Sequence, residues 1–238
     1  MENTDFKKVA TAIMQRRNLH KITRFSYAVD ERTVLQLVQA IGDELCYKGF
    51  TFDDDNRTIY QNCLNWLIGS PFQAIDPKTG KIVKGDERKG LFIAGNCGTG
   101  KSLLLTILAA MSSYYNIEYD FGTDHRKLIW KEWRADELCN QFILSGADVI
   151  VEAKKSNILC LNDIGSEPAE QMYMGNRVNI IRQILEARGD QSGQFTLITS
   201  NYPMLHEQIR QQYGDRVVSR LQGMCNYFVL KGKDRRNQ

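Results

Sequence analysis

The stretch Gly95-Asn96-Cys97-Gly98-Thr99-Gly100-Lys101-Ser102 decides the fold of this chain. It matches the pattern G-x-x-x-x-G-K-[ST] in full, directly after the apolar run 91–94 and directly before a stretch with helical spacing. In such a loop the backbone N–H groups converge on phosphate oxygens at the positive end of the following helix. The pattern therefore predicts a nucleoside triphosphate site, and we expect ATP with Mg²⁺.

Each residue type in this loop has a role in binding the phosphates or the metal. The three glycines allow tight turns, Lys101 neutralises the β- and γ-phosphates, and the Ser102 hydroxyl coordinates Mg²⁺. We expect the whole loop and the next residue to contact the nucleotide, namely Gly95, Asn96, Cys97, Gly98, Thr99, Gly100, Lys101, Ser102 and Leu103.

A second motif, Ile158-Leu159-Cys160-Leu161-Asn162-Asp163, has four apolar residues followed by an amide and an acid. Enzymes with such a loop use carboxylates on a neighbouring strand to hold Mg²⁺ and to orient the attacking water. Asn162 takes the first acidic position, so we expect it to accept from a metal-bound water and to hold Mg²⁺ weakly. Either Asp163 activates the water, or Asp163 serves the metal and Glu167 is the substitute base.

Around the loop, short apolar runs alternate with helical spacings. Strands are predicted at 91–94, 117–121, 158–161, 195–199 and 226–230, and helices at 102–111, 136–144, 178–188 and 206–213. This alternation is typical of an α/β fold, with a mostly parallel sheet flanked by helices.

The N-terminal part has a different pattern. Helical spacing over 32–46 and 57–67 predicts a small helical region at 1–70, and the Asp/Asn cluster at 53–56 is expected to cap the second helix. The turn signal Asp76-Pro77-Lys78-Thr79-Gly80 makes 71–88 a linker or hairpin, and 89–238 is then the ATPase domain. The helices could bind a partner or pack against the chain's own ATPase domain.

Bulk properties fit a globular protein that is neither secreted nor inserted in a membrane. The 238 residues are 42% hydrophobic and 25% charged, with charges at the start and no apolar run long enough to span a bilayer. Six cysteines without a C-x-x-C pair are typical of reduced thiols. We therefore expect a cytoplasmic protein.

Basic residues gather at both ends, although the net charge is only +3. Such clusters are commonly solvated, and contact with a phosphate backbone is the alternative. The members are Lys7, Lys8, Arg16, Arg17, Lys21 and Arg24 near the start, and Lys231, Lys233, Arg235 and Arg236 near the end.

Four motifs, in this order and at these separations, resemble those of a known family: residues 89–102, residues 162–167, Thr199-Ser200-Asn201 and residues 213–221. Over roughly 85–236 the chain resembles the DnaC-type helicase loaders, which with the IstB transposition helpers form a branch of the AAA+ ATPases. The resemblance implies an AAA+ type P-loop NTPase fold without a C-terminal lid domain. Whether Arg235 or Arg236 replaces the missing sensor 2 residue of a lid stays open.

The resemblance also assigns roles. Asn162 and Asp163 look like the Walker B pair, with Ser102 completing the metal site, and Asn201 looks like the sensor 1 residue. Arg220 looks like the arginine finger that reaches the γ-phosphate of a neighbouring subunit, which implies a homo-oligomer with ATP at its interfaces. The alternatives are an ordinary salt bridge for Arg220 and Arg216 as the finger.

The leading hypothesis is an ATPase that helps to load a replicative DnaB-type helicase onto single-stranded DNA. An IstB-like transposition helper on duplex DNA shares the same motifs. The change to Asn162 leaves open a third possibility, a nucleotide-dependent binding module that hydrolyses ATP slowly or not at all. A small-molecule kinase is disfavoured because nothing in the sequence suggests an acceptor-binding lid.

Overall fold

A five-stranded parallel sheet forms the centre of the protein. The computed structural model describes residues 5, 22–47, 49–191 and 193–235. The parallel strands lie in the order β12-β4-β11-β8-β7, so the loop-bearing strand β4 sits between β12 and β11. Their bounds are β4 Gly90–Ala94, β7 Glu132–Arg134, β8 Ile158–Ile164, β11 Phe195–Ser200 and β12 Cys225–Val229. The expected α/β fold with a mostly parallel sheet is confirmed.

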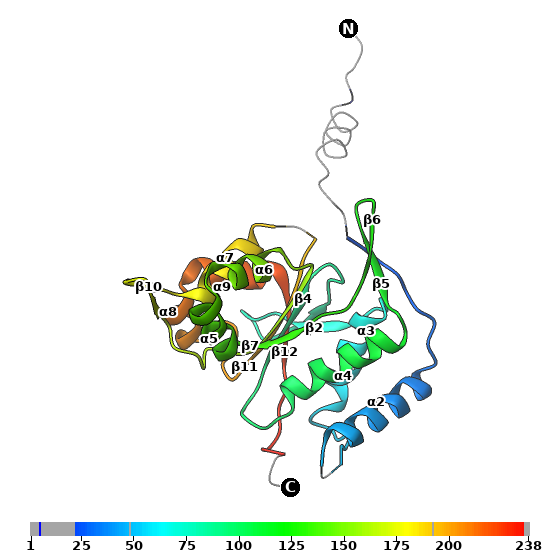
Figure 1. The fold of residues 1–238 in the computed structure, drawn as a ribbon. Helices are drawn as coiled ribbons and strands as arrows, with labels where there is room; N and C mark the ends of the chain where they lie inside the picture. Colours follow the sequence, from blue (N-terminus) through cyan, green and yellow to red (C-terminus); the bar gives the residue numbers. More distant parts are fainter. Residues whose placement is uncertain (1–4, 6–21, 48, 192, 236–238) are drawn as a thin grey trace.

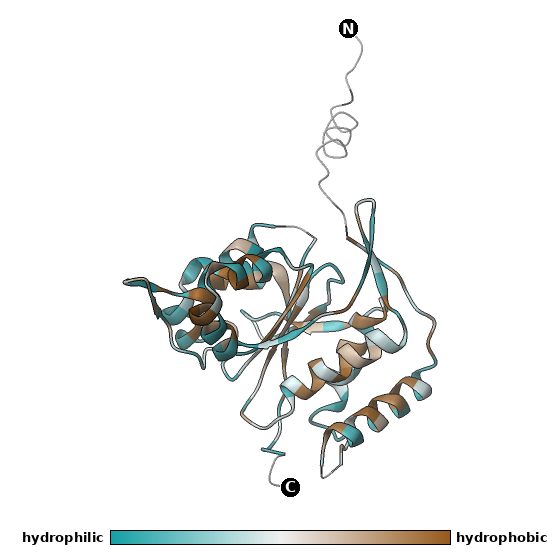
Figure 2. Ribbon diagram, in the orientation of Figure 1, coloured by the Kyte–Doolittle hydropathy of each residue, from teal (hydrophilic) through white to brown (hydrophobic). Residues whose placement is uncertain are grey.

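Helices cover both faces of this sheet (Figure 1). On one face lie α2 Glu31–Leu45, α3 Arg57–Leu67 and α4 Lys101–Tyr114. On the other lie α5 Ala135–Ser145, α6 Ala147–Lys155, α7 Ile180–Gly189, α8 Glu207–Tyr213 and α9 Asp215–Met224. Each central strand is apolar on both faces because both faces are covered, and the apolar stripes of the helices turn inward in Figure 2.

The N-terminal helices belong to the same core as the central sheet. Val38 of α2 and Trp66 of α3 are fully buried, in the same apolar cluster as Leu104 and Leu108 of α4. The Trp66 indole N–H donates to the carbonyl oxygen of Lys89 at 2.8 Å. Of the two expectations for these helices, packing against the rest of the chain is therefore observed for the described residues 22–47 and 49–70.

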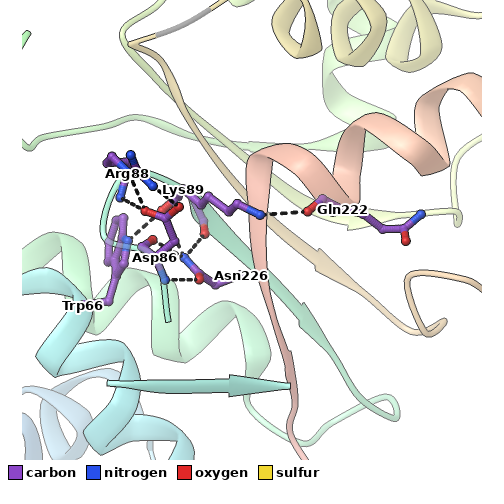
Figure 3. Close-up of polar contacts among 7 residues, drawn as sticks. Trp66, Asp86, Arg88, Lys89, Gln222 and Asn226 are labelled. Atoms are coloured by element: carbon purple, nitrogen blue, oxygen red, sulfur yellow. Dashed lines mark hydrogen bonds and ion pairs between the residues drawn. The ribbon is translucent and has the colours of Figure 1, made fainter. Parts of the chain in front are cut away.

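The segment between α3 and β4 is a hairpin that extends the sheet. Strands β2 Gln73–Ile75 and β3 Ile82–Lys84 pair antiparallel, and β2 pairs antiparallel with β12. Asn226 of β12 anchors the end of the hairpin: its amide accepts from Asp86 N–H and donates to the carbonyl oxygens of Asp86 and Gly90 (Figure 3). Of the two alternatives expected for 71–88, a linker or a hairpin, the structure shows a hairpin that is held to the sheet through β12.

Two small antiparallel units were not expected. Strands β1 Ile22–Arg24, β5 Glu118–Phe121 and β6 Asp124–Lys127 form a separate three-stranded sheet, and β9 Gln171–Tyr173 pairs with β10 Asn176–Val178. The strand expected at 117–121 exists, but it lies outside the parallel sheet. Its partner β6 carries four charged residues, Asp124, His125, Arg126 and Lys127, so no apolar run marks the pairing.

Arg24 does not lie on a solvated basic face. Its side chain is buried, its Nη2 donates to the carbonyl oxygens of Trp66 and Leu67, and its guanidinium lies 4.9 Å from the centre of the Trp66 ring. Burial lowers the pKa of Arg24 to about 10. Arg24 thus ties β1 to α3, whereas Lys7, Lys8, Arg16, Arg17, Lys21 and Arg236 lie outside the described residues.

The Asp/Asn cluster before α3 does not cap that helix with a side chain. Asn56 is the N-cap residue, but its Oδ1 accepts from Asp53 N–H at 3.0 Å, and Asp53 Oδ1 accepts from the N–H groups of Asp55 and Asn56. The cluster satisfies its own backbone instead of the helix, as short polar side chains in turns often do.

None of the six cysteines, all of which lie in the described part of the chain, forms a disulfide. Of the helices in the described ranges, none is long and apolar enough to cross a bilayer.

Candidate nucleotide-binding site

The loop between β4 and α4 has the backbone form that phosphate binding requires. Gly98 and Gly100 have φ values of +75° and +95°, and residues other than glycine rarely adopt this backbone conformation. Gly95 lies so close to the carbonyl oxygen of Leu230 that a Cβ atom there would come within 2.3 Å of it. Thr99 closes the loop by donating from Oγ1 to the carbonyl oxygen of Asn96 at 2.9 Å.

Helix α4 begins at this loop without a side-chain cap. Its N-cap residue is Gly100, which has no side chain to cap the helix, and Ser102 and Leu103 of its first turn lie half-buried. Uncapped N–H groups and the helix dipole together favour an anion at this position. Among the described residues no group of three or more His, Cys, Asp and Glu side chains is placed to hold a metal ion.

Lys101 joins the loop to the end of β11. Its Nζ donates to the carbonyl oxygens of Gly95 and Asn96, both at 2.9 Å, and to Oδ1 of Asn201 at 2.8 Å. Lys101 is only 5% exposed, whereas Asn201 is exposed. The structure therefore brings together the loop lysine and the residue expected at the sensor 1 position.

Asn162 is buried at the end of β8, and protein groups take both ends of its amide. Its Oδ1 accepts from Thr199 Oγ1 at 3.0 Å, and its Nδ2 donates to Glu132 Oε2 at 2.9 Å. The same Glu132 oxygen lies 3.2 Å from the hydroxyl of Thr106 on α4. Asn162 thus contacts a carboxylate that the sequence did not point to.

Sequence reasoning missed both Glu132 and Thr199. Glu132 lies on the three-residue strand β7, which has no apolar run and no motif. Thr199 was quoted only as part of a motif, yet its hydroxyl accepts from Asp163 N–H at 2.8 Å and donates to Asn162. The parallel pairing of β8 with β7 and β11 is what brings these residues to one edge.

Asp163 has an uncommon backbone conformation, with a φ of +60°. Its carbonyl oxygen accepts from the N–H and the hydroxyl of Ser166, which closes a tight turn directly after the acid. Non-glycine residues held in this region cost free energy and often mark functional sites. Its side chain is half-buried at the carboxyl end of β8.

Glu167 is a structural residue in the core. Its Oε2 accepts from Gly165 N–H at 2.9 Å, and its Oε1 accepts from Gln212 Nε2 at 2.9 Å and from the Tyr213 hydroxyl. Burial raises the pKa of the Glu167 carboxyl, although these hydrogen bonds oppose the shift. With both oxygens engaged, Glu167 is poorly placed to act as the substitute base.

Arg220 lies on α9 against the end of α7. Its Nη2 forms an ion pair with Asp190, its aliphatic carbons pack on Gly189, and its side chain is only 13% exposed. Its Nη1 is buried without a hydrogen-bond partner among the described residues. Arg216 lies 3.7 Å from the other oxygen of Asp190 and is far more exposed. Asp190 therefore holds both candidate arginines within the chain.

The segment after β12 runs along the loop. Arg235 N–H donates to the Gly98 carbonyl oxygen at 3.0 Å, and the Asp234 carboxylate lies against Gly98. The Arg235 guanidinium forms an ion pair with Asp53 at 2.7 Å. Arg235 is thus close to the loop through its backbone, while its charge is paired with the N-terminal region.

Comparisons with known proteins bear on the fold. No protein-family model matches the sequence, and no curated protein matches it. A provisionally assigned primosome component from Streptococcus pyogenes serotype M3 has a similar structure, with 20% identity, a TM-score of 0.52, and coverage of 77% of this chain and 84% of that one.

Two further solved structures match. AMPPCP-bound DnaA from Aquifex aeolicus shares 15% identity at a TM-score of 0.51, and the match covers 83% of this chain and 53% of that one. A DnaC helicase loader shares 19% identity at a TM-score of 0.47, covering 77% and 94%. At such identities the likenesses to the primosome component and to DnaA show the fold alone, and this chain shares with them the α/β fold with a mostly parallel sheet flanked by helices.

Proposed function

We propose that the protein binds ATP with Mg²⁺ at the loop 95–102 and hydrolyses it. The observation that carries the proposal is the contact of Lys101 with both the loop carbonyls and Asn201, which joins a predicted site residue at the start of α4 to one directly after β11. Lys101 then neutralises the phosphates, Ser102 supplies a hydroxyl ligand to the metal, and Gly100 to Leu103 supply N–H groups. Bound Mg²⁺ supplies charge neutralisation at the phosphates.

Asp163 is the proposed base and Asn201 the proposed sensor of the γ-phosphate. Asp163 lies near the end of β8, where its backbone has a φ of +60° and its N–H donates to the Thr199 hydroxyl. Asn201 already accepts from Lys101, so a γ-phosphate that draws Lys101 away would change the partners of Asn201. The engaged oxygens of Glu167 leave Asp163 as the better candidate for the base.

We place the protein in DNA replication, as a homo-oligomeric ATPase that helps to load a replicative DnaB-type helicase onto single-stranded DNA. Two structurally similar proteins, the provisionally assigned primosome component and DnaA, support a role in replication. Arg220 would complete the ATP site of a neighbouring subunit once it leaves Asp190.

A basic and aromatic cavity supports binding to single-stranded DNA. It measures about 460 Å³, and residues of the β6–β7 segment and of α6 line it, among them Arg126, Trp130, Lys131 and Trp133. The Lys131 ammonium lies 3.9 Å from the centre of the Trp133 ring, and the Trp130 N–H is buried without a partner among the described residues. Aromatic faces stack bases and cations bind phosphates, a combination that is typical of single-strand binding.

ATP affinity and turnover test the chemistry. We expect the purified protein to bind an ATP analogue more tightly with Mg²⁺ than with a chelator, and Lys101→Ala to lose binding by about a hundredfold. Appreciable turnover by the unaltered protein would rule out the non-hydrolysing module. Failure to bind ATP in either condition would refute the proposal.

DNA binding and partner capture test the biological role. Affinity for single-stranded DNA above that for duplex favours the loader, and the reverse favours the IstB-like helper. We expect Lys131→Ala to weaken single-strand binding and Lys84→Ala, an exposed lysine on β3 at the opposite edge of the sheet, to leave it unchanged. A host replicative helicase that does not bind the ATP-loaded protein would refute helicase loading.

A further inference from the structure

The carboxylate of Glu132 lies at the position where the second motif lacks a charge. Glu132 is on β7, directly beside β8, and its Oε2 accepts from Asn162 Nδ2 at 2.9 Å. That oxygen is also 3.2 Å from Thr106 Oγ1, and Thr106 lies one helical turn beyond Ser102 on α4. The carboxylate therefore lies between the end of β8 and the start of the helix that carries Ser102.

Thr199 fixes the direction of the Asn162 amide. The Thr199 hydroxyl accepts from Asp163 N–H at 2.8 Å and donates its own hydrogen to Asn162 Oδ1 at 3.0 Å. Asn162 Nδ2 then points at Glu132, where only a donor is tolerated because an ionised carboxylate has no hydrogen to give. The Asn162 oxygen is thus used within the protein, and we no longer expect it to hold a metal-bound water.

Glu132 has a second oxygen to offer. Both of its hydrogen bonds in the described structure use Oε2, and Oε1 has no hydrogen-bond partner among the described residues. The residue as a whole is half-buried. A half-buried carboxylate with one oxygen fixed and the other available is well suited to hold a metal-bound water.

We propose that Glu132 supplies the carboxylate that the second motif lacks, and that Asn162 is its positioning residue. This inference rests on the proposed ATP and Mg²⁺ site. The second motif would place the carboxylate on β8, but here the carboxylate comes from Glu132 on β7 and the neutral amide from Asn162 on β8. An aspartate at 162 would place two carboxylates side by side, which raises the pKa of one of them and favours its protonation. The pair of Glu132 and Asn162 therefore keeps one negative charge, so Asn162 in the second motif does not by itself imply weak binding of Mg²⁺.

The proposal can be tested by removing the charge at position 132 and then restoring a charge at position 162. In Glu132→Gln the amide still accepts from Asn162, so the fold is kept while the charge is lost. The quantity to compare is the gain in ATP-analogue affinity when Mg²⁺ replaces a chelator. We expect this gain to be about tenfold smaller in Glu132→Gln than in the unaltered protein, while the affinity in chelator is unchanged. The double variant Glu132→Gln/Asn162→Asp restores one charge and one amide, so we expect it to recover most of the Mg²⁺ effect. Mn²⁺ binding in the presence of the analogue, followed by electron paramagnetic resonance, gives a readout independent of turnover.

Glu137→Gln is the matched control, because Glu137 is an exposed acid at the start of α5. We expect it to behave as the unaltered protein. An unchanged Mg²⁺ effect in Glu132→Gln, or no recovery in the double variant, would overturn the inference while leaving the proposed ATP site intact. If the unaltered protein binds no ATP, the proposed function fails first, and the inference fails with it.

Discussion

Lys101 Nζ donates a 2.8 Å hydrogen bond to Asn201 Oδ1, across the gap between the start of α4 and the end of β11. This contact makes opposite predictions for two substitutions of Asn201. In Asn201→Ala, Lys101 keeps the carbonyl oxygens of Gly95 and Asn96 as partners, so ATP affinity should change little. Turnover should fall about tenfold or more, because a polar group near the reacting phosphate is lost.

Asn201→Asp should behave differently. A carboxylate at 201 would form an ion pair with Lys101 and repel the phosphates, so ATP affinity should fall by about tenfold. Titration with a fluorescent ATP analogue separates the two variants. If both keep normal affinity and normal turnover, Asn201 has no role at the γ-phosphate.

Glu167 predicts a pH dependence of stability. Its carboxyl has a raised pKa because it is buried, so the folded protein holds this proton more tightly than the unfolded chain does. The stability contributed by this proton is present below the ordinary glutamate range and is lost as the pH rises through the raised pKa. Glu167→Gln cannot titrate, so its free energy of unfolding should fall less than that of the unaltered protein as the pH rises above about 4.5.

Urea denaturation at several pH values measures this difference. The exposed acid Glu137 again provides the control, since Glu137→Gln should leave the pH profile unchanged. Parallel profiles for Glu167→Gln and the unaltered protein would show that Glu167 does not titrate abnormally.

The sequence predicts the centre of the fold well and its edges poorly. The apolar runs of β4, β8 and β11 are visible because both faces of these strands are buried. The edge strand β7 has one apolar residue, Trp133, between two charged ones, so nothing in its pattern distinguishes it from a loop. The segment 71–88 was predicted only as a linker or hairpin, because the pairing of β2 with β12 depends on a strand far away in the sequence, as the pair Ile75 and Tyr227 shows.

The candidate site divides in the same way. The loop 95–102 and the acid Asp163 near the end of β8 belong to local motifs, so the sequence alone could point to them. Glu132 was not found, because its proximity to Asn162 arises from the pairing of β7 with β8 and has no sequence spacing of its own. Arg24 was misjudged for a similar reason: a basic residue near other basic residues gives no sign that its partners will be the carbonyl oxygens at the end of α3.

Trp66 tests whether the N-terminal helices and the central sheet share one core. It is fully buried, contacts Phe195 of β11 edge to face, and donates to Lys89. Trp66→Ala should lower the free energy of unfolding by about 3–5 kcal/mol, as expected for loss of a large buried aromatic. Tyr47→Ala, at a fully exposed position, should change it by less than about 0.5 kcal/mol.

Chemical denaturation followed by far-ultraviolet circular dichroism gives both values. A single unfolding transition that shifts as a whole in Trp66→Ala supports one cooperative unit. Two transitions, of which only the first shifts, would show that the N-terminal helices unfold independently.

Arg220 should act on ATP bound by a neighbouring subunit, although Asp190 holds it within its own chain in this structure. Lys101→Ala subunits lack a working loop but keep Arg220, and Arg220→Ala subunits have the opposite defect. Each variant alone should have very low turnover, and mixing them should restore a measurable part of it, because some interfaces then contain both an intact loop and an intact arginine. Asp190→Asn should weaken the ion pair and raise the turnover of the assembled protein.

Arg216→Ala is the matched control for this experiment, since Arg216 faces the same aspartate at 3.7 Å but is more exposed. If Arg220 is the finger, Arg216→Ala keeps most of the turnover; if Arg216 is, the two variants exchange behaviour. If Arg220 serves only to join α9 to α7, then Arg220→Ala should lower the melting temperature and mixing should restore nothing. Turnover of the mixtures, read together with the melting temperature of each variant, therefore separates an interface role from a purely structural one.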